Sequence, residues 1–174
     1  MGMSVTISAA RAHDAEHIFK LQYLCYQTEA ELYGDYGIEP LTQSLEDLRA
    51  EIAQGHALVA RLGDEVVASV RARVDEGGTA RIAKLIVHPR MQRHGLGGRL
   101  LDAIEERFAG EPGAKRFQLF TGHRSESNLQ LYRSRGYVPV ASEQVGPKLT
   151  LVTLEKEASA LGAPPGRSLG EYVA

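Results

Sequence analysis

Hydrophobic and polar positions alternate near the start of the chain, and such alternation predicts a strand. Val5, Ile7 and Ala9 share one face of a predicted strand over residues 4–9. Polar, glycine-containing turns separate the next three predicted strands, which indicates an antiparallel meander. These strands cover residues 57–62, 65–74 and 79–87, and shorter apolar stretches predict three more over residues 117–121, 137–141 and 149–155.

Apolar residues also recur at helical spacing, and this predicts four amphipathic helices. Asp14 is a candidate N-cap for the first helix, whereas Ser44 opens the second and Gly55 ends it. The segment 29–42 is polar, aromatic and glycine-containing, so we expect a loop with at most a short helical piece. The predicted helices cover residues 15–26, 45–54, about 98–108 and 125–135, and Gly110 to Gly113 break the third.

Together these elements predict a single domain over residues 1–157 with an α+β fold. A mixed, mostly antiparallel sheet of about six to seven strands is expected, flanked by about four helices. The chain has 174 residues, which is enough to bury a core. Residues 158–174 are rich in Ala, Gly and Pro, and this composition predicts a flexible tail.

Composition limits the kinds of binding partner and the cellular location that we expect for the protein. The net charge of −2 gives no reason to expect nucleic acid or a membrane surface as a partner. No apolar run is long enough to span a bilayer, and the single cysteine, Cys25, rules out an internal disulfide. We therefore expect a cytoplasmic protein, and we expect Cys25 to lie on a helix with its side chain in the hydrophobic core.

The most informative stretch is residues 85–101. An apolar run ends at Pro89, a basic glycine-rich turn follows, and an amphipathic helix starts directly after the turn. This order gathers main-chain N–H groups at a helix N-terminus, which is a binding site for phosphate or pyrophosphate. Glycines at 95, 97 and 98 let a ligand approach the backbone closely. Arg93 and Arg99 add positive charge nearby.

Two common phosphate-binding motifs do not fit this turn. The dinucleotide fingerprint G-x-G-x-x-G fails because Leu100 stands at its last position. The nucleoside-triphosphate loop fails because no lysine follows the glycines. A glycine-rich turn that binds nothing remains the structural alternative on these residues alone.

Gln92-Arg93-His94-Gly95-Leu96-Gly97 resembles the Q/R-x-x-G-x-G/A signature of the GCN5-related N-acetyltransferases, the GNAT family. A second segment of that family is similar to Asn128–Tyr132 followed by Gly136-Tyr137. The two segments occur in the family's order and in the same strand–helix context. The resemblance covers roughly residues 4–155 and implies the acyl-CoA N-acyltransferase fold with acetyl-CoA as acyl donor.

The resemblance also implies roles for individual residues. Main-chain amides of the turn would hold the pyrophosphate of the cofactor, and the preceding strand would pair its backbone with the pantetheine arm. Asn128 would contact that arm, and Tyr132 would protonate the leaving thiolate, since a phenol with a pKa of about 10 is protonated at neutral pH. The implied cofactor-binding residues are Leu85, Ile86, Val87, Gln92, Arg93, His94, Gly95, Leu96, Gly97, Gly98 and Asn128.

One position departs from the family pattern. Many relatives carry a glutamate as general base on the strand before the glycine turn, whereas residues 80–87 here include Arg81 and Lys84 but no carboxylate. Either the acceptor amine arrives neutral or another segment supplies the base. Candidates in the acidic segment 29–42 are Glu29, Glu31, Asp35 and Glu39, although a solvated acidic loop has the same composition. Glu29, Glu31, Tyr33 and His123 are the candidate acceptor-binding residues.

The resemblance implies an N-acetyltransferase that moves an acetyl group directly to a primary amine of a small molecule or a protein. The missing strand carboxylate favours a second hypothesis, a catalytically weak acetyl-CoA sensor or partner module. His13 and His17 lie four residues apart, but the zinc pattern lacks its other ligands, so no metal is expected. The oligomeric state stays open between a monomer and a homodimer.

Overall fold

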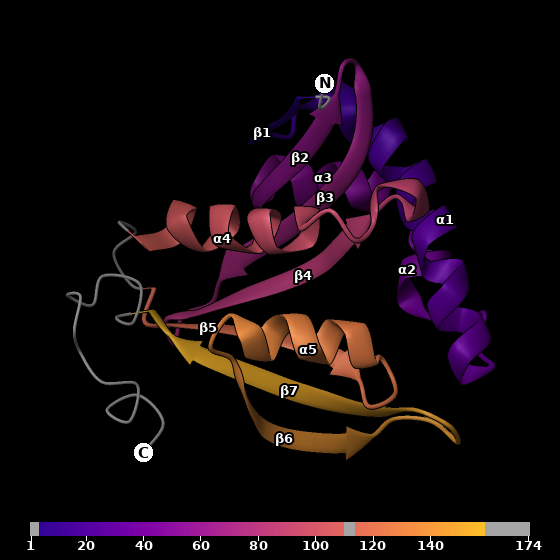
Figure 1. The fold of residues 1–174 in the computed structure, drawn as a ribbon, viewed down its shortest axis with the longest axis vertical. Coiled ribbons are helices and arrows are strands. Elements are labelled where there is room, and N and C mark those ends of the chain that lie inside the picture. The colour runs from indigo at the N-terminus through magenta and orange to yellow at the C-terminus, as the bar shows by residue number, and fades with distance from the viewer. Residues whose placement is uncertain (1–3, 110–113, 159–174) are drawn as a thin grey trace.

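The structure is a computed structural model that describes residues 4–109 and 114–158. Seven strands form one sheet in the order β1-β2-β3-β4-β5-β7-β6 (Figure 1). All neighbouring strands run antiparallel except β4 and β5, which are parallel. The predicted α+β class with a mixed sheet is confirmed. The strands are β1 (Val5–Ala9), β2 (His56–Leu62), β3 (Glu65–Val74), β4 (Thr79–Val87), β5 (Arg116–Gly122), β6 (Val138–Gln144) and β7 (Thr150–Glu157).

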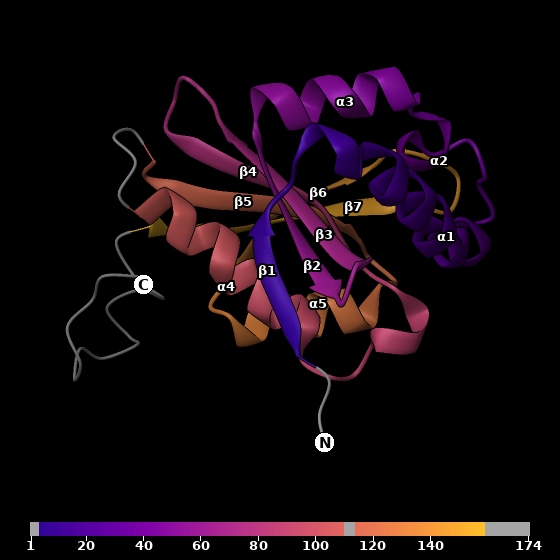
Figure 2. The same cartoon turned by 90° about the horizontal axis from the view of Figure 1, so that it is seen from above.

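Helices cover both faces of the sheet. Figure 2 shows α1, α2 and α3 on one face and α4 and α5 on the other. Four of the helices match the predicted ones, and α2 is a short helical piece of the kind expected within segment 29–42. The helices are α1 (Ala15–Tyr33), α2 (Glu39–Thr42), α3 (Leu45–Gln54), α4 (Leu96–Ala109) and α5 (Glu126–Ser134).

Each face of the sheet has its own hydrophobic core. On one face, Ile18 and Leu21 of α1 and Leu48 of α3 pack against Val59 and Ile86 of the sheet. On the other, apolar residues of α4 and α5 pack against β2 to β5 and β7. Among the fully buried side chains of this second core are Leu100, Leu101, Ile104, Phe108, Phe117 and Leu154. Strand β4 contributes side chains to both cores, so it is packed between α1 on one face and α4 on the other.

The segment 29–42 differs most from the prediction, because it is mainly helical and not a loop. Helix α1 continues to Tyr33, and Gly34 ends it in the left-handed conformation (φ 65°). Ala30 and Tyr33 are buried, so tertiary packing stabilises this last part of the helix despite its polar composition. Only residues 34–38 separate α1 from α2.

Two smaller predictions at helix starts are also corrected. Asp14 is the N-cap residue of α1, but its side chain makes no capping hydrogen bond to that helix. It accepts instead from the N–H of Arg11 (2.8 Å) and from Arg61 (2.6 Å). Helix α4 starts at Leu96, two residues before the predicted position, so Gly97 and Gly98 form its first turn.

The predicted break at residues 110–113 and the tail from residue 159 lie outside the described residues. Within the described ranges, no helix is long and apolar enough to cross a membrane.

Strand β4 is irregular where it leaves its parallel neighbour. Its pairing with β5 covers Thr79 to Arg81 only, and Figure 1 shows the two strands diverging beyond that point. The register with β3 shifts in the same region, where Lys84 has φ 53°. A left-handed conformation at a residue with a side chain costs about 1–3 kcal/mol, and a bulge bends its strand. The bulge and the divergence together open the sheet at the carboxyl end of β4.

Candidate active site

The opening between β4 and β5 is the first part of the site. Beyond Arg81, no described strand pairs with the β5 side of β4, whereas β3 pairs along its other side as far as Val87. Strand β5 pairs with β7 along its whole length. The opening therefore exposes main-chain groups around Leu85 to an extended ligand. The carbonyl of Val87 is already engaged, since Cys25 Sγ (3.4 Å) and Gln92 Nε2 (3.2 Å) both donate to it.

The glycine-rich turn lies at the end of β4. Arg93 (φ 69°) and Gly95 (φ 74°) both adopt the left-handed conformation. The main-chain N–H groups of residues 93–98 make no hydrogen bond to any described residue, and the last of them belong to the first turn of α4. Successive free N–H groups of this kind, together with a helix N-terminus, favour an anion.

Two glycines of the turn serve different purposes. A Cβ at Gly95 would meet nothing within 4 Å, so its surroundings are open. A Cβ at Gly97 would approach Leu131 Cδ2 to 3.4 Å and Val87 Cγ2 to 3.8 Å. Gly97 therefore lies between β4 and α5. Of the two arginines expected to add charge, Arg99 donates to the carbonyl of Val5 (3.4 Å).

Helix α5 contributes Asn128 and Tyr132. Asn128 Nδ2 lies 3.4 Å from Thr121 Oγ1 on β5. Tyr132 is 6% exposed, and its hydroxyl makes no hydrogen bond to a described residue. Burial, and then the negative charge of Glu29, raise the pKa of Tyr132. The phenol therefore keeps its proton throughout the neutral range.

A hydrogen-bonded chain ties α1 to the start of α5. The Ser125 hydroxyl donates to Glu29 Oε2 (2.9 Å), so the Tyr33 hydroxyl donates to Ser125 Oγ (2.8 Å). The N–H of Arg124 donates in turn to the Tyr33 hydroxyl (3.0 Å). This chain fixes Glu29 on the side of α1 that faces α5. Burial raises the pKa of Tyr26 most, and the neighbouring Tyr132 and the negative charge of Glu29 raise it further.

The other predicted acceptor-binding residues lie differently. Tyr33 is buried, and its hydroxyl belongs to the hydrogen-bonded chain between α1 and α5. His123 is exposed, and its Nδ1 accepts from the N–H of Thr150 (3.0 Å). Glu31 is exposed on α1 and lies outside the chain of hydrogen bonds. Of the predicted carboxylates, the structure brings Glu29 toward Tyr132, and Glu39 pairs with Lys84 (2.7 Å).

Sequence reasoning missed Gly122, the last residue of β5. A Cβ there would lie 2.9 Å from Tyr33 Cε2 and closer still to the Cζ atom and the hydroxyl oxygen of the same side chain. Only glycine lets the Tyr33 ring reach Ser125. The available signal was the glycine between a strand and a helix, but nothing in the local sequence indicated its partner on α1.

The comparisons with known proteins agree with this geometry. The family described as Acetyltransferase (GNAT) matches residues 16–137. The chain belongs to the GNAT acetyltransferase family. A search of curated proteins returned no matching relative.

Solved GNAT structures share the fold at low sequence identity. One is yncA from Salmonella typhimurium with its cofactor acetyl-CoA, which is 20% identical with a TM-score of 0.71 and covers 94% of this chain and 99% of that one. Another is the PaiA N-acetyltransferase of Thermoplasma acidophilum in complex with coenzyme A, at 16% identity and TM-score 0.72 over 87% and 98%. A third is the ribosomal-protein-S18-alanine N-acetyltransferase of Escherichia coli, at 15% identity and TM-score 0.73 over 95% and 99%.

The GNAT family uses acetyl-CoA, and the residues of this chain fit that cofactor. Free N–H groups of residues 93–98 suit a pyrophosphate, and the open surroundings of Gly95 leave space for it. The unpaired edge of β4 suits an amide-containing arm. Within the described ranges, no group of three or more His, Cys, Asp and Glu side chains is placed to hold a metal ion.

Proposed function

We propose that this chain is an N-acetyltransferase that moves the acetyl group of acetyl-CoA directly to a primary amine of a small molecule or a protein. The observation that carries the proposal is the row of free N–H groups at residues 93–98, directly after the strand that diverges from β5. Hydrogen bonds to a charged group contribute about 1.5–3 kcal/mol each, so several together hold a pyrophosphate firmly.

In this proposal, the turn and β4 orient the cofactor. Residues 93–98 would bind the pyrophosphate through main-chain N–H groups, whereas the N–H of Gln92 already donates to the carbonyl of Pro89 (3.5 Å). Leu85, Ile86 and Val87 would line the arm with their backbone. Asn128 contacts the arm from α5. Bound acetyl-CoA supplies an acetyl thioester, whose C–S bond breaks as the amine nitrogen takes the acetyl group.

Tyr132 holds the proton that the departing thiolate needs. Its raised pKa keeps the hydroxyl protonated, and the hydroxyl is free of other hydrogen bonds to described residues. General acid–base groups typically contribute about 10²–10⁴-fold to a rate. Removing the hydroxyl should therefore lower kcat and leave acetyl-CoA binding nearly unchanged.

Glu29 is the proposed acceptor of the amine proton. The only hydrogen bond it receives from the described residues comes from the neutral hydroxyl of Ser125, and none of the ion pairs between described residues includes it. An alkylammonium acceptor with a pKa of about 10.4 must lose a proton before attack, and an ionised carboxylate both attracts it and takes that proton. This role replaces the missing carboxylate of β4.

The test is a thiol-release assay with acetyl-CoA and a panel of small amines, lysine peptides and peptide N-termini. We expect turnover with at least one amine, and a loss of about 100-fold in kcat for Tyr132→Phe and for Glu29→Gln. Glu46→Gln, which removes an exposed carboxylate of α3, is the matched control and should keep the parent rate. Parent-like turnover by Tyr132→Phe would contradict the assigned acid.

The absence of a carboxylate on β4 favours one second candidate, an acetyl-CoA-binding module with little catalysis. Such a module would gain thermal stability from acetyl-CoA and release no thiol with any amine of the panel. The same assay combined with a binding measurement therefore separates the two candidates.

A further inference from the structure

Lys84 stands where β4 changes direction. It lies three residues beyond the last residue of β4 that pairs with β5, and inside the register shift between β4 and β3. Its left-handed backbone (φ 53°) is unusual for a residue with a side chain, and the surrounding structure must hold such a residue in place. Whatever fixes Lys84 therefore also fixes the bend that opens the sheet.

The Lys84 side chain is held by oxygen atoms from the helices on one face of the sheet. It is 11% exposed, and its Nζ lies 2.7 Å from Glu39 Oε1 and 3.6 Å from Glu51 Oε1. Gln43 Oε1 accepts from the same Nζ at 3.1 Å. Glu39 lies in α2, Gln43 follows α2 directly, and Glu51 lies in α3.

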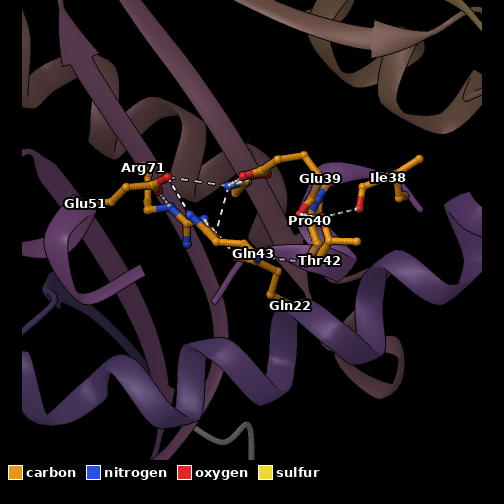
Figure 3. Close-up of polar contacts among 9 residues, drawn as sticks. Gln22, Ile38, Glu39, Pro40, Thr42, Gln43, Glu51 and Arg71 are labelled. Carbon is orange, nitrogen blue, oxygen red and sulfur yellow. Dashed lines mark hydrogen bonds and ion pairs between the residues drawn. The ribbon is translucent and has the colours of Figure 1, made fainter. Parts of the chain in front are cut away.

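Gln43 links this ammonium group to the neighbouring strand and to α1. Its Oε1 also accepts from Gln22 Nε2 (3.0 Å) and Arg71 Nη2 (3.3 Å), and its Nε2 donates to Glu51 Oε1 (2.6 Å). Arg71 is buried on β3 opposite Ala83, and its Nε lies 2.7 Å from Glu51 Oε2. Figure 3 shows these side chains converging between the strands and the helices.

The network also fixes α2 itself. Gln22 Nε2 donates to the carbonyl of Pro40 (2.9 Å), and Figure 3 shows Glu39 and Pro40 at the end of the network nearest α2. Residues 34–42 thus have a polar connection to β4 in addition to their chain connections to α1 and α3. A displacement of α2 moves the Glu39 carboxylate, which makes the shortest polar contact with Lys84 Nζ.

We infer that Lys84 is a positioning residue that couples α2 to the opening between β4 and β5. The inference rests on the proposed function, because that function assigns the opening to the cofactor. With the ion pair to Glu39 intact, the bulge keeps β4 away from β5. When the pair is lost, β4 relaxes toward regular pairing and the opening fits acetyl-CoA less well. Coupling between two sites is reciprocal, so acetyl-CoA in turn stabilises the present position of α2.

The experiment measures the Kd of acetyl-CoA by titration calorimetry for the parent, Glu39→Gln, Lys84→Met and the double variant. Glu39 is 61% exposed and distant in sequence from the glycine turn, so its substitution preserves the fold. Glu16→Gln is the matched control, because Glu16 is 64% exposed and pairs with Arg49 of α3 at 3.3 Å without involving β4. The melting temperature of every variant is recorded alongside.

We expect Glu39→Gln and Lys84→Met each to raise the Kd by about fivefold or more, the lower end of typical couplings between sites. The double variant should match Lys84→Met, because Glu39 acts through Lys84. Glu16→Gln should keep the parent Kd. An unchanged Kd for Glu39→Gln and Lys84→Met, or additive effects in the double variant, would overturn the inference and leave a purely structural ion pair.

The outcomes also separate this inference from the proposed function. A parent that binds acetyl-CoA but acetylates no amine defeats the proposed reaction, and the Kd series still decides the role of Lys84. A parent that shows no acetyl-CoA binding defeats both the placement of the cofactor and the coupling.

Discussion

The hydroxyl of Tyr137 donates a 2.6 Å hydrogen bond to Oε2 of Glu105, a carboxylate that is only 1% exposed. Lys156 Nζ lies 2.8 Å from the other oxygen, Oε1, and 5.5 Å from the centre of the Tyr137 ring. Burying a carboxylate is costly unless its oxygens are partnered, and here both are. These two contacts join Glu105 of α4 to Lys156 of β7 and to Tyr137, which directly precedes β6. They therefore attach the carboxyl-terminal strands to α4.

Tyr137→Phe should therefore destabilise the fold. The substitution keeps the ring and leaves one oxygen of a buried carboxylate without its donor, which costs about 1.5–3 kcal/mol. Urea unfolding at pH 7 measures this loss. Tyr23→Phe is the control, because Tyr23 is 58% exposed and its loss of a hydroxyl should change stability little. Equal stabilities of the two variants would show that Glu105 does not depend on Tyr137.

Asp14 should make stability depend on pH in the acid range. Burial raises the pKa of this carboxyl, but the Arg61 guanidinium and the N–H of Arg11 more than offset it, so the pKa is lowered in the folded state. A lowered folded pKa means that the contribution is complete above the unfolded value of about 3.9 and is lost as the pH falls through the folded value.

Comparing Asp14→Asn with the parent tests this relationship. The variant should be less stable at pH 7, and the difference in free energy of unfolding should shrink once the pH falls below about 4. Unfolding by urea at a series of pH values measures the difference. A gap between variant and parent that stays constant from pH 7 to pH 2 would contradict the role of the ionised carboxylate.

Gly95→Glu should abolish acetyl-CoA binding while preserving the fold. The new side chain has open space, yet it adds a negative charge beside the N–H groups proposed to hold the pyrophosphate. Gly63→Glu is a close control, because Gly63 has a similar φ (63°) and also meets nothing within 4 Å, but lies in the β2–β3 turn. Both variants bear the same left-handed strain, so a difference between them reports on the ligand.

A thermal-shift series with acetyl-CoA distinguishes the two glycine variants. Ligand at about 100 times its Kd stabilises a protein by roughly 2.7 kcal/mol, and the parent and Gly63→Glu should both gain that amount. Gly95→Glu should gain nothing. A parent-like gain for Gly95→Glu would move the pyrophosphate away from this turn.

The sequence predicted those parts of the fold whose signals are local. Alternation identified β1, polar glycine-containing turns separated β2, β3 and β4, and glycines with a helical apolar pattern identified the turn before α4. The end of α1 was mistaken for a loop because Ala30 and Tyr33 are stabilised by partners elsewhere in the chain, Ser125 among them. The polar composition of that segment carried no sign of those contacts.

The candidate site likewise has parts that local sequence signals predict and parts that depend on long-range contacts. The N–H groups of the turn follow from consecutive residues, so their role was accessible from sequence. The approach of Glu29 to Ser125 joins positions 96 residues apart, and the polar network around Lys84 draws on three helices and two strands. Such groupings depend on how the helices pack on the sheet, and a single sequence does not record that packing.

Cys25→Ala should leave acetyl transfer nearly intact. Cys25 is half-buried on α1, beside the end of β4, and burial raises the pKa of its thiol to about 11. At neutral pH the nucleophilic thiolate is therefore scarce, which disfavours a covalent acetyl-cysteine and favours direct transfer.

The alanine variant loses one weak hydrogen bond to Val87, so we expect kcat within about threefold of the parent, as for a modest loss of packing. Steady-state kinetics checks the rate, and mass spectrometry of the parent mixed with acetyl-CoA alone should find no acetylated Cys25. A complete loss of turnover in Cys25→Ala, with acetyl-CoA still bound, would replace direct transfer by a two-step reaction through this thiol.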